Sequence, residues 1–333
     1  MRRPSEIFKP ETESKMAKKY TNTGNKDTRS GFGAGLLEAG KKNPNIVALA
    51  ADLAGSVKMD AFAKEFPERF FQCGIAEANM IGAAAGLAIT GKVPFAGSFA
   101  EFVTGRVYDQ IRQEVAYGHT NVKIASSHSG ITLGEDGATH QTMEDIALMR
   151  ALPNMVVINP CDYNQCKAAT LAIAEYVGPV YLRYGRPSMP NFTPEDQTFE
   201  IGKAVMMNEG TDVTIFATGH LVWEAVNAAE LLEADGISAE VIDIATIKPL
   251  DVEAVVTSAK KTGAVVCAEE HNMCGGLGEL IAGVLASHVP TPIEYINGGD
   301  KFGQSGTPAQ LLKAYDMDAA HIAEAAKKVI GRK

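Results

Sequence analysis

The chain has 333 residues, 46% of them apolar, which allows about two domains with ordinary hydrophobic cores. Its net charge of −9, with both signs interspersed, disfavours nucleic acid or an anionic membrane as the main partner. The longest apolar run is too short to cross a bilayer and the N-terminus shows no apolar signal core, so we expect a cytoplasmic protein. The five scattered cysteines lack CxxC spacing, which favours free thiols over disulfides or a zinc site.

The first part of the chain consists of a polar arm followed by a domain in which strand and helix signals alternate. Residues 1–25 are polar, mixed in charge and aperiodic, and they predict a flexible or partner-binding N-terminal arm. In residues 26–186, strand and helix signals then alternate strictly. The predicted strands are 46–50, 69–72, 93–96, 122–126, 155–158 and 180–184, and the predicted helices are 28–39, 57–65, 77–90, 101–117, 144–151 and 163–174. This pattern predicts an α/β domain whose parallel sheet is covered on both faces and collects ligands at the carboxyl ends of its strands.

A second, smaller α/β domain is predicted for residues 199–333. The linker before it, residues 187–198, holds three prolines that interrupt both periodicities. The predicted strands of the second domain are 213–217, 239–244 and 264–268, and its predicted helices are 223–234, 251–260, 278–287, 308–315 and 318–329. The chain is therefore expected to form two consecutive α/β domains.

A single carboxylate, Glu77, lies where an apolar strand turns through Gly74 into a helix. The helix over residues 78–90 is almost wholly apolar, so we expect it to be buried on most sides and to carry Glu77 into the interior. A buried carboxylate needs a partner. The simpler interpretation is a helix-start glutamate that is stabilised by the helix dipole and by free backbone N–H groups.

The loop over residues 127–141 has the composition of a site. It follows a predicted strand and contains three glycines, two acidic residues and two histidines, without helical or strand periodicity. Such loops at strand ends more often bind ligands than simply connect elements. His128 and His140 lie too far apart for a helical metal-binding pair and no HxxEH spacing occurs, so no metal site is expected in this chain.

Several motifs in order resemble the pyrimidine-binding half of a transketolase. They are Ala51-Asp52-Leu53-Ala54-Gly55-Ser56, Gly74-Ile75-Ala76-Glu77, Phe99-Ala100-Glu101-Phe102 and the Gly-Glu-Asp-Gly-Ala-Thr-His-Gln run at 134–141. The resemblance extends through Tyr181-Leu182-Arg183 and into a domain similar to the transketolase C-terminal domain. It implies a thiamine diphosphate pyrimidine-binding fold followed by that smaller α/β domain.

The family's diphosphate-binding domain, with its Gly-Asp-Gly motif, has no counterpart here. The resemblance therefore implies the small subunit of a split transketolase. A separate large subunit would hold the diphosphate of thiamine diphosphate and the Mg²⁺ or Ca²⁺ ion, in an assembly with two copies of each chain. The implied reaction moves a two-carbon ketol unit between a ketose phosphate and an aldose phosphate, as in the pentose phosphate pathway.

The resemblance also assigns residues to the cofactor. Glu77 matches the carboxylic acid that donates to the distal pyrimidine nitrogen and promotes the imino tautomer, and burial would raise its pKa for this purpose. Phe99 and Phe102 match the aromatic side chains that pack on the pyrimidine ring, and Asp52 matches an acid near the cofactor. A third family aromatic falls at Gly105, which leaves that part of the pocket open or filled differently.

The sugar phosphate is implied to contact a second set of residues. The phosphate would be bound by Arg29, Arg183 and Ser56, with His140 beside it. Asp136 and His128 match groups that contact sugar hydroxyls. The two histidines are also candidates for moving protons as carbonyl and hydroxyl interconvert.

Three other interpretations compete with the small-subunit prediction. Deoxyxylulose-phosphate synthase shares Gly-x-Asp-Gly-x-Thr-His and the Tyr-Asp-Gln at 108–110, but it has an aspartate at the position of His128 and an arginine at that of Ser129. The beta chain of 2-oxoacid dehydrogenases has a Gly-His-Ser-Gln loop that is absent here. A non-catalytic scaffolding paralogue would have no use for the intact Glu77 and His140.

Overall fold

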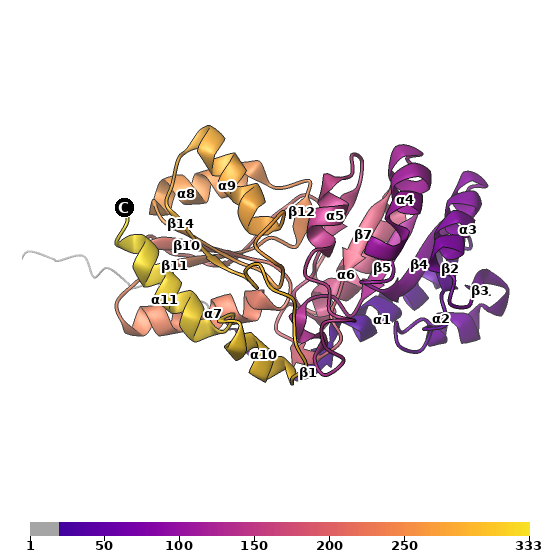
Figure 1. Ribbon diagram of the computed structural model, residues 1–333, viewed down its shortest axis with the longest axis horizontal. Coiled ribbons are helices and arrows are strands. Elements are labelled where there is room, and N and C mark those ends of the chain that lie inside the picture. Colours follow the sequence, from indigo (N-terminus) through magenta and orange to yellow (C-terminus); the bar gives the residue numbers. More distant parts are fainter. Residues whose placement is uncertain (1–19) are drawn as a thin grey trace, which may run out of the picture.

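The computed structural model describes residues 20–333, which form two α/β domains side by side along the long axis of the molecule (Figure 1). Residues 1–19, most of the predicted N-terminal arm, lie outside the described residues. The first domain is built on a seven-stranded sheet in the order β12-β6-β7-β5-β4-β2-β3. Its strands are β2 (Ile46–Ala50), β3 (Phe70–Gln72), β4 (Val93–Phe99), β5 (Lys123–Ser127), β6 (Val156–Ile158), β7 (Val180–Arg183) and β12 (Thr246–Lys248). All of them except β12 run parallel, as predicted.

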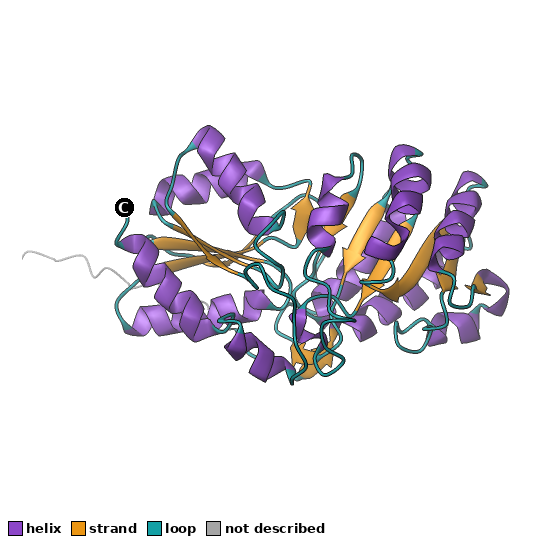
Figure 2. Ribbon diagram, viewed as in Figure 1, coloured by secondary structure: helices purple, strands orange, loops and turns teal. Residues whose placement is uncertain are grey.

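Helices cover both faces of this sheet (Figure 2). One face carries α1 (Thr28–Lys42), α2 (Asp60–Glu65) and α6 (Tyr163–Glu175), which share a buried core with the strands. The other face carries α3 (Glu77–Ile89), α5 (Asp145–Ala151) and the helical turns around α4 (Tyr108–Gln110). The apolar strands are buried from both sides, which is why they read as continuous hydrophobic runs.

The position of α1 depends on glycines that face α6. A Cβ atom at Gly31 would lie 2.4 Å from the carbonyl oxygen of Tyr163, and one at Gly35 would lie 2.7 Å from Cβ of Thr170. The two helices therefore approach more closely than any side chain would allow. The Asp27 carboxylate caps α1 by accepting the N–H of Ser30 at 3.0 Å.

The sheet has a topological switch at β2. This strand pairs with β3 on one side and with β4 on the other, so the chain winds in opposite directions from it. A crevice forms at such a point outside the carboxyl ends of the strands. The segments that follow β2, β3, β4 and β5, which carry most of the predicted site residues, emerge at this edge.

The second domain is a five-stranded sheet in the order β14-β13-β10-β11-β9, with only β9 antiparallel among these strands. Its strands are β9 (Val205–Asn208), β10 (Val213–Ala217), β11 (Ala239–Asp243), β13 (Val265–Ala268) and β14 (Ile293–Ile296). Helices α7 (Leu221–Ala234) and α11 (Ala319–Ile330) pack on one face, and α8 (Val252–Thr262) and α9 (Leu277–His288) on the other. The short α10 (Pro308–Ala314) lies against the turn at residues 131–133 of the first domain.

The two halves of the chain interlock. Strand β12 comes from the second half but pairs with β6 at the edge of the first sheet. Within the predicted linker, β8 (Ser188–Pro190) pairs antiparallel with β1 (Asn25–Asp27), and the ring of Tyr20 lies edge-on to Phe192 with centroids 5.7 Å apart. The pattern missed these strands because three residues are too few to show a period.

Two of the predicted helices differ from the structure. The helix predicted over residues 101–117 is instead a series of turns, a 3₁₀ turn at Gly105–Val107, the single turn α4 and a π-helix at Ile111–Tyr117. Gly105 and the residues around it have too little helical preference to hold one continuous α-helix. The helix predicted over residues 57–65 begins only at Asp60, since Lys58 has a left-handed backbone with φ 62°.

Helix α3 is less buried than its composition predicts. Ala78, Ala83 and Gly86 are exposed along one side, and Ile89 is 78% exposed. The prediction that this helix is buried on most sides is therefore wrong for the single chain. An apolar stripe of small side chains remains open beside the first turn, which carries Glu77. Across residues 20–333, no helix is both long and apolar enough to span a membrane.

The glycine contact between α1 and α6 gives a stability prediction. Gly31→Ala should lower the free energy of unfolding by about 1–3 kcal/mol, because the new methyl group must displace backbone. Gly283→Ala is the matched control, since it is an exposed helical glycine whose Cβ would meet no atom within 4 Å. That change should raise stability by about 0.5–1 kcal/mol. Urea unfolding would measure both, and equal effects would contradict the close packing of α1 on α6.

Candidate active site

The predicted site residues from the first sheet meet at its switch point. Phe99 ends β4, and its ring stacks on His128, which follows β5, with centroids 3.7 Å apart. Phe102 lies parallel to Phe99 at 5.8 Å, and His140 sits edge-on to both phenylalanine rings. Two adjacent strand ends thus build one aromatic wall from residues far apart in sequence.

His128 is held in one orientation. It has a left-handed backbone with φ 63°, is only 3% exposed, and its Nδ1 hydrogen-bonds with Ser127 Oγ at 2.8 Å. Burial, together with the smaller effect of the nearby charges of Arg29, Arg186 and His140, lowers the pKa of His128 to about 3. The imidazole is therefore neutral at physiological pH and able to donate or accept a hydrogen bond.

Glu77 is the buried carboxylate of the site. It begins α3 and is 4% exposed. Its partner is Arg106, whose Nη1 lies 3.1 Å and 3.2 Å from the two carboxylate oxygens. The same guanidinium lies over the ring of Phe102, 4.2 Å from its centroid. The sequence indicated that Glu77 needs a partner but gave no signal for Arg106, because the contact joins the turns after two different strands.

Arg29 and Ser56 contact each other near His128. Arg29 lies in the first turn of α1 and donates from Nη1 to the backbone carbonyl of Ser56 at 3.1 Å and from Nε to Asp27 at 3.3 Å. Asp52 is exposed, with φ 58°, and its N–H donates to the Gln72 side chain at 2.6 Å.

Asp136 is exposed near the tip of the 127–141 loop. Gly105 is exposed, and a Cβ there would meet no atom within 4 Å, so the family's third aromatic has no substitute at this position.

Arg183 does not join this group. It is 2% exposed, and its Nε and Nη2 bind the Asp145 carboxylate at 2.7 Å and 3.2 Å. Nη2 also donates to the backbone carbonyl of Glu270 in the second domain at 2.8 Å, and Tyr181 donates its hydroxyl to Asp145 at 2.6 Å. We therefore revise the phosphate role expected for Arg183, since its guanidinium is enclosed by protein and tied to the domain interface.

Arg186 is the cation that the sequence reasoning missed. It lies three residues beyond Arg183, past the end of β7, and its partly exposed side chain donates to Leu133 O at 2.9 Å and to Glu135 at 3.1 Å. Together with Arg29 it contributes to the lowered pKa of His128, so both cations lie near that ring. The signal was available, because ligands collect beyond the carboxyl end of a strand and not within it.

The second domain makes hydrogen bonds with the loop over residues 127–141. Glu270 accepts the N–H of Thr132 at 2.9 Å. The Gln141 amide donates to the carbonyls of Ile131 and of Gln304, at 2.9 Å and 3.0 Å. Residues 127–141 are therefore fixed between the two domains.

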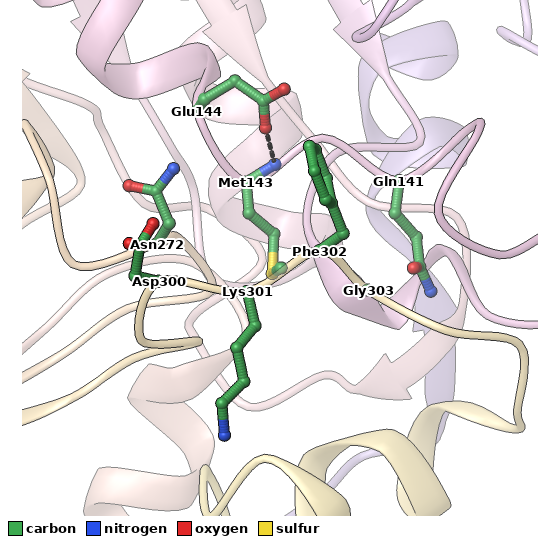
Figure 3. A pocket seen from close by; sticks show the side chains of 8 residues that line it. All are labelled: Gln141, Met143, Glu144, Asn272, Asp300, Lys301, Phe302 and Gly303. Atoms are coloured by element: carbon green, nitrogen blue, oxygen red, sulfur yellow. Dashed lines mark hydrogen bonds between the residues drawn. The ribbon is translucent and has the colours of Figure 1, made fainter.

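A pocket beside this loop lies between the domains (Figure 3). Phe302 projects between Met143 and Gln141, whereas Lys301 points away from the other side chains. The pocket is lined by Gln141, Met143, Glu144, Asn272, Asp300, Lys301, Phe302 and Gly303. The aromatic wall and Glu77 lie outside it. No three His, Cys, Asp or Glu side chains within residues 20–333 gather into a metal site.

Comparison with known proteins matches both domains. Residues 25–191 match the family described as transketolase, pyrimidine binding domain, and residues 202–322 match transketolase, C-terminal domain. A protein named "Putative transketolase C-terminal section" from Methanocaldococcus jannaschii is 51% identical over 302 residues, which cover 90% of this chain and 95% of that protein. A 6-deoxy-6-sulfo-D-fructose transketolase subunit from Clostridium sp. is 45% identical over 298 residues, with 90% and 92% covered.

A solved structure described as a split gene transketolase, inactive beta4 tetramer, has a TM-score of 0.85 and 46% identity, over 92% of this chain and 99% of that chain. The fold and the site thus define a pyrimidine-binding domain followed by the domain that accompanies it in thiamine-dependent enzymes. The chain belongs to the transketolase family.

The residues present fit the pyrimidine of thiamine diphosphate. A buried carboxylate at a helix start and a flat aromatic side chain contact the same planar guanidinium, that of Arg106, and such a pair suits a planar heterocycle that has ring nitrogens at its rim. Glu77, Phe99 and Phe102 would hold the ring.

The pKa of His128 gives a pH prediction. Between pH 6.5 and about 3 the unfolded chain takes up a proton that the folded state excludes, so stability falls as the pH drops below about 6.5. Because a pH unit within this window is worth about 1.4 kcal/mol, wild-type protein should lose roughly 2 kcal/mol more between pH 7 and pH 5 than His128→Asn. Asparagine tolerates the left-handed backbone. Urea unfolding at both pH values tests this, and equal losses would show that His128 is accessible to protons.

Proposed function

We propose that the chain is the small subunit of a thiamine diphosphate-dependent transketolase that moves a two-carbon ketol unit from a ketose to an aldose with an anionic terminal group. The observation that supports this most strongly is that the buried Glu77 carboxylate and the Phe102 ring both contact the Arg106 guanidinium, near the switch point of the sheet. Histidines and two arginines border the same crevice. We call Glu77, Phe99 and Phe102 the ring site, and Arg29 and Arg186 the anion site. A substrate bound between them would contact both.

The ring half of the site prepares the cofactor. When bound, thiamine diphosphate supplies a carbon nucleophile for attack on the ketose carbonyl. Glu77 holds a proton at the distal nitrogen of the pyrimidine, and its helix start keeps the carboxyl group fixed and shielded from water. Phe99 and Phe102 present flat apolar faces that orient the ring. Asp52 lies on the turn after β2 at the rim of this half.

The sugar half recognises hydroxyls and a terminal anion. Neutral His128 donates or accepts hydrogen bonds at the sugar oxygens, while His140, on the outer side of the aromatic wall, moves protons there. Asp136 reaches the sugar from the loop tip. Arg29, with Ser56 beside it, and Arg186 bind the anionic end, because guanidinium forks bind phosphate or sulfonate oxygens well. The name of the Clostridium relative, a sulfofructose transketolase subunit, accords with a terminal anion of either kind.

The partner we propose is a large subunit that carries the diphosphate and Mg²⁺ or Ca²⁺ contacts, in an assembly of two copies of each chain. The exposed stripe of Ala78, Ala83, Gly86 and Ile89 borders the first turn of α3, where an apolar partner surface would cover both the helix and Glu77. The matched solved structure, described as an inactive beta4 tetramer of a split gene transketolase, accords with the need for such a partner.

The test of this function is Glu77→Gln in complex with the large subunit that copurifies with the tagged chain. Glutamine keeps the size of the side chain but cannot hold an exchangeable acid proton, so ketol transfer should fall by about 10²-fold or more. Deuterium exchange at the reactive carbon of the bound cofactor should slow by a comparable factor. Unfolding stability should change by only about 1 kcal/mol or less, because the lost ion pair is half exposed. Wild-type proton exchange in this variant would refute the assignment.

Arg186 and Arg183 provide a second test. Arg186→Ala should raise the KM for sugar phosphates by about tenfold, because it loses one partly exposed charge-assisted contact with the phosphate. The KM for the unphosphorylated donor hydroxypyruvate should change much less. Arg183→Ala is the contrasting variant. It should lose about 3–5 kcal/mol of stability by leaving Asp145 buried without its partner. Steady-state kinetics with both donors and urea unfolding separate the two roles, and equal losses on both donors in Arg186→Ala would remove it from the anion site.

A further inference from the structure

Arg106 lies against the same two groups to which the proposed function assigns the cofactor ring. Its Nη1 is 3.1 Å and 3.2 Å from the Glu77 carboxylate oxygens. Its guanidinium carbon is 4.2 Å from the centroid of the Phe102 ring. One planar cationic group therefore faces both the buried acid and the aromatic side chain.

A guanidinium matches an aminopyrimidine in the properties that this site recognises. Both are flat and delocalised, and both stack on aromatic faces. The guanidinium directs N–H groups towards a carboxylate, and the ring does so when its distal nitrogen carries the proton that it shares with Glu77. The guanidinium and the ring would need the same carboxylate oxygens and the same space beside Phe102. They cannot occupy it together.

We propose that Arg106 occupies the ring site in the cofactor-free subunit and is displaced when the pyrimidine ring of thiamine diphosphate binds. This inference rests on the proposed function. It gives Arg106 a role that the family resemblance did not assign, as a side chain that competes with the cofactor and sets its affinity.

The buried carboxylate of Glu77 explains why the Arg106 side chain occupies this site. A carboxylate at 4% exposure is costly without a partner, because burial removes the water that would otherwise solvate it. Arg106 supplies that partner from within the chain. The subunit can therefore fold with an acid already positioned for a ligand that arrives later.

The surroundings of Arg106 allow it to leave. Its side chain is 51% exposed, so the guanidinium already reaches solvent. The preceding Gly105 has open space where a side chain would lie, and both residues belong to a 3₁₀ turn instead of a regular helix. Glu101 lies within the electrostatic reach of Arg106, since burial raises the pKa of this acid while the Arg106 charge opposes the rise. A second acid is thus close to the displaced guanidinium.

The contact itself is tested first in the isolated full chain, with a double-mutant cycle. Arg106→Ala should lower the melting temperature when Glu77 is present, but should have little effect in the Glu77→Gln background. An equal loss in both backgrounds would mean that Arg106 does not pair with Glu77, and the proposal would fail.

Displacement is tested in the complex with the copurified large subunit, by titrating thiamine diphosphate and following protein fluorescence. Arg106→Ala should bind the cofactor roughly three- to tenfold more tightly than Arg112→Ala, because the ring no longer has to break the ion pair and the cation–π contact. Arg112 is an exposed arginine of the same segment, so its variant removes the same charge without opening the ring site. Arg106→Lys, which keeps the charge but lacks the planar fork, should fall between wild type and Arg106→Ala.

The outcomes distinguish this inference from the function on which it rests. If the wild-type complex binds no thiamine diphosphate, the proposed function fails and the displacement proposal fails with it. If the wild-type complex binds the cofactor but Arg106→Ala binds no more tightly than Arg112→Ala, only the displacement proposal is refuted.

Discussion

The buried ion pair between Asp145 and Arg183 is the contact on which the geometry of the site depends. It joins the start of α5 to the end of β7, and Arg183 continues it to the backbone of Glu270 in the second domain. The carboxylate of Glu270 then holds Thr132 in the site loop. Removing one member of such a pair leaves a charge stranded in the interior, which typically costs about 3–5 kcal/mol. The loop that carries His128 and His140 is thereby attached to the buried interface between the two domains.

Charge is distributed unevenly around the crevice that this framework supports. The cations Arg29 and Arg186 lie on the side of His128, and their fields, together with burial, keep that imidazole neutral. The buried acid Glu77 and the ring of Phe102 share the Arg106 guanidinium. A ligand assembly with an anionic end and a ring nitrogen that hydrogen-bonds with a carboxylic acid would therefore be oriented along one axis before any reaction begins.

Local patterns predicted those parts of the fold that local chemistry decides. The strand at 46–50 and the helix start at Glu77 agree with the structure, because apolar runs and turn residues specify them within a few positions. Strand β12 escaped prediction, since its three residues show no period and its pairing partner, about ninety residues earlier in the chain, leaves no local signal. The candidate site residues were likewise predictable only where a local pattern indicated them. The loop histidines were found from composition, whereas the enclosure of Arg183 by protein depends on its position inside the sheet. The Arg106 contact depends on two turns meeting in space.

The interlocking of the sheets restricts how the chain can be divided. The proline-rich linker is where composition suggests a cut, yet a fragment that ended there would lack β12 and leave β6 as an open edge of hydrogen-bonding groups. Such an edge invites pairing with other chains. The same fragment would also lose Glu270 and leave Arg183 without its backbone acceptor. A gene rearrangement that separated the two domains in the linker would therefore be expected to produce a half more prone to aggregation than the whole chain.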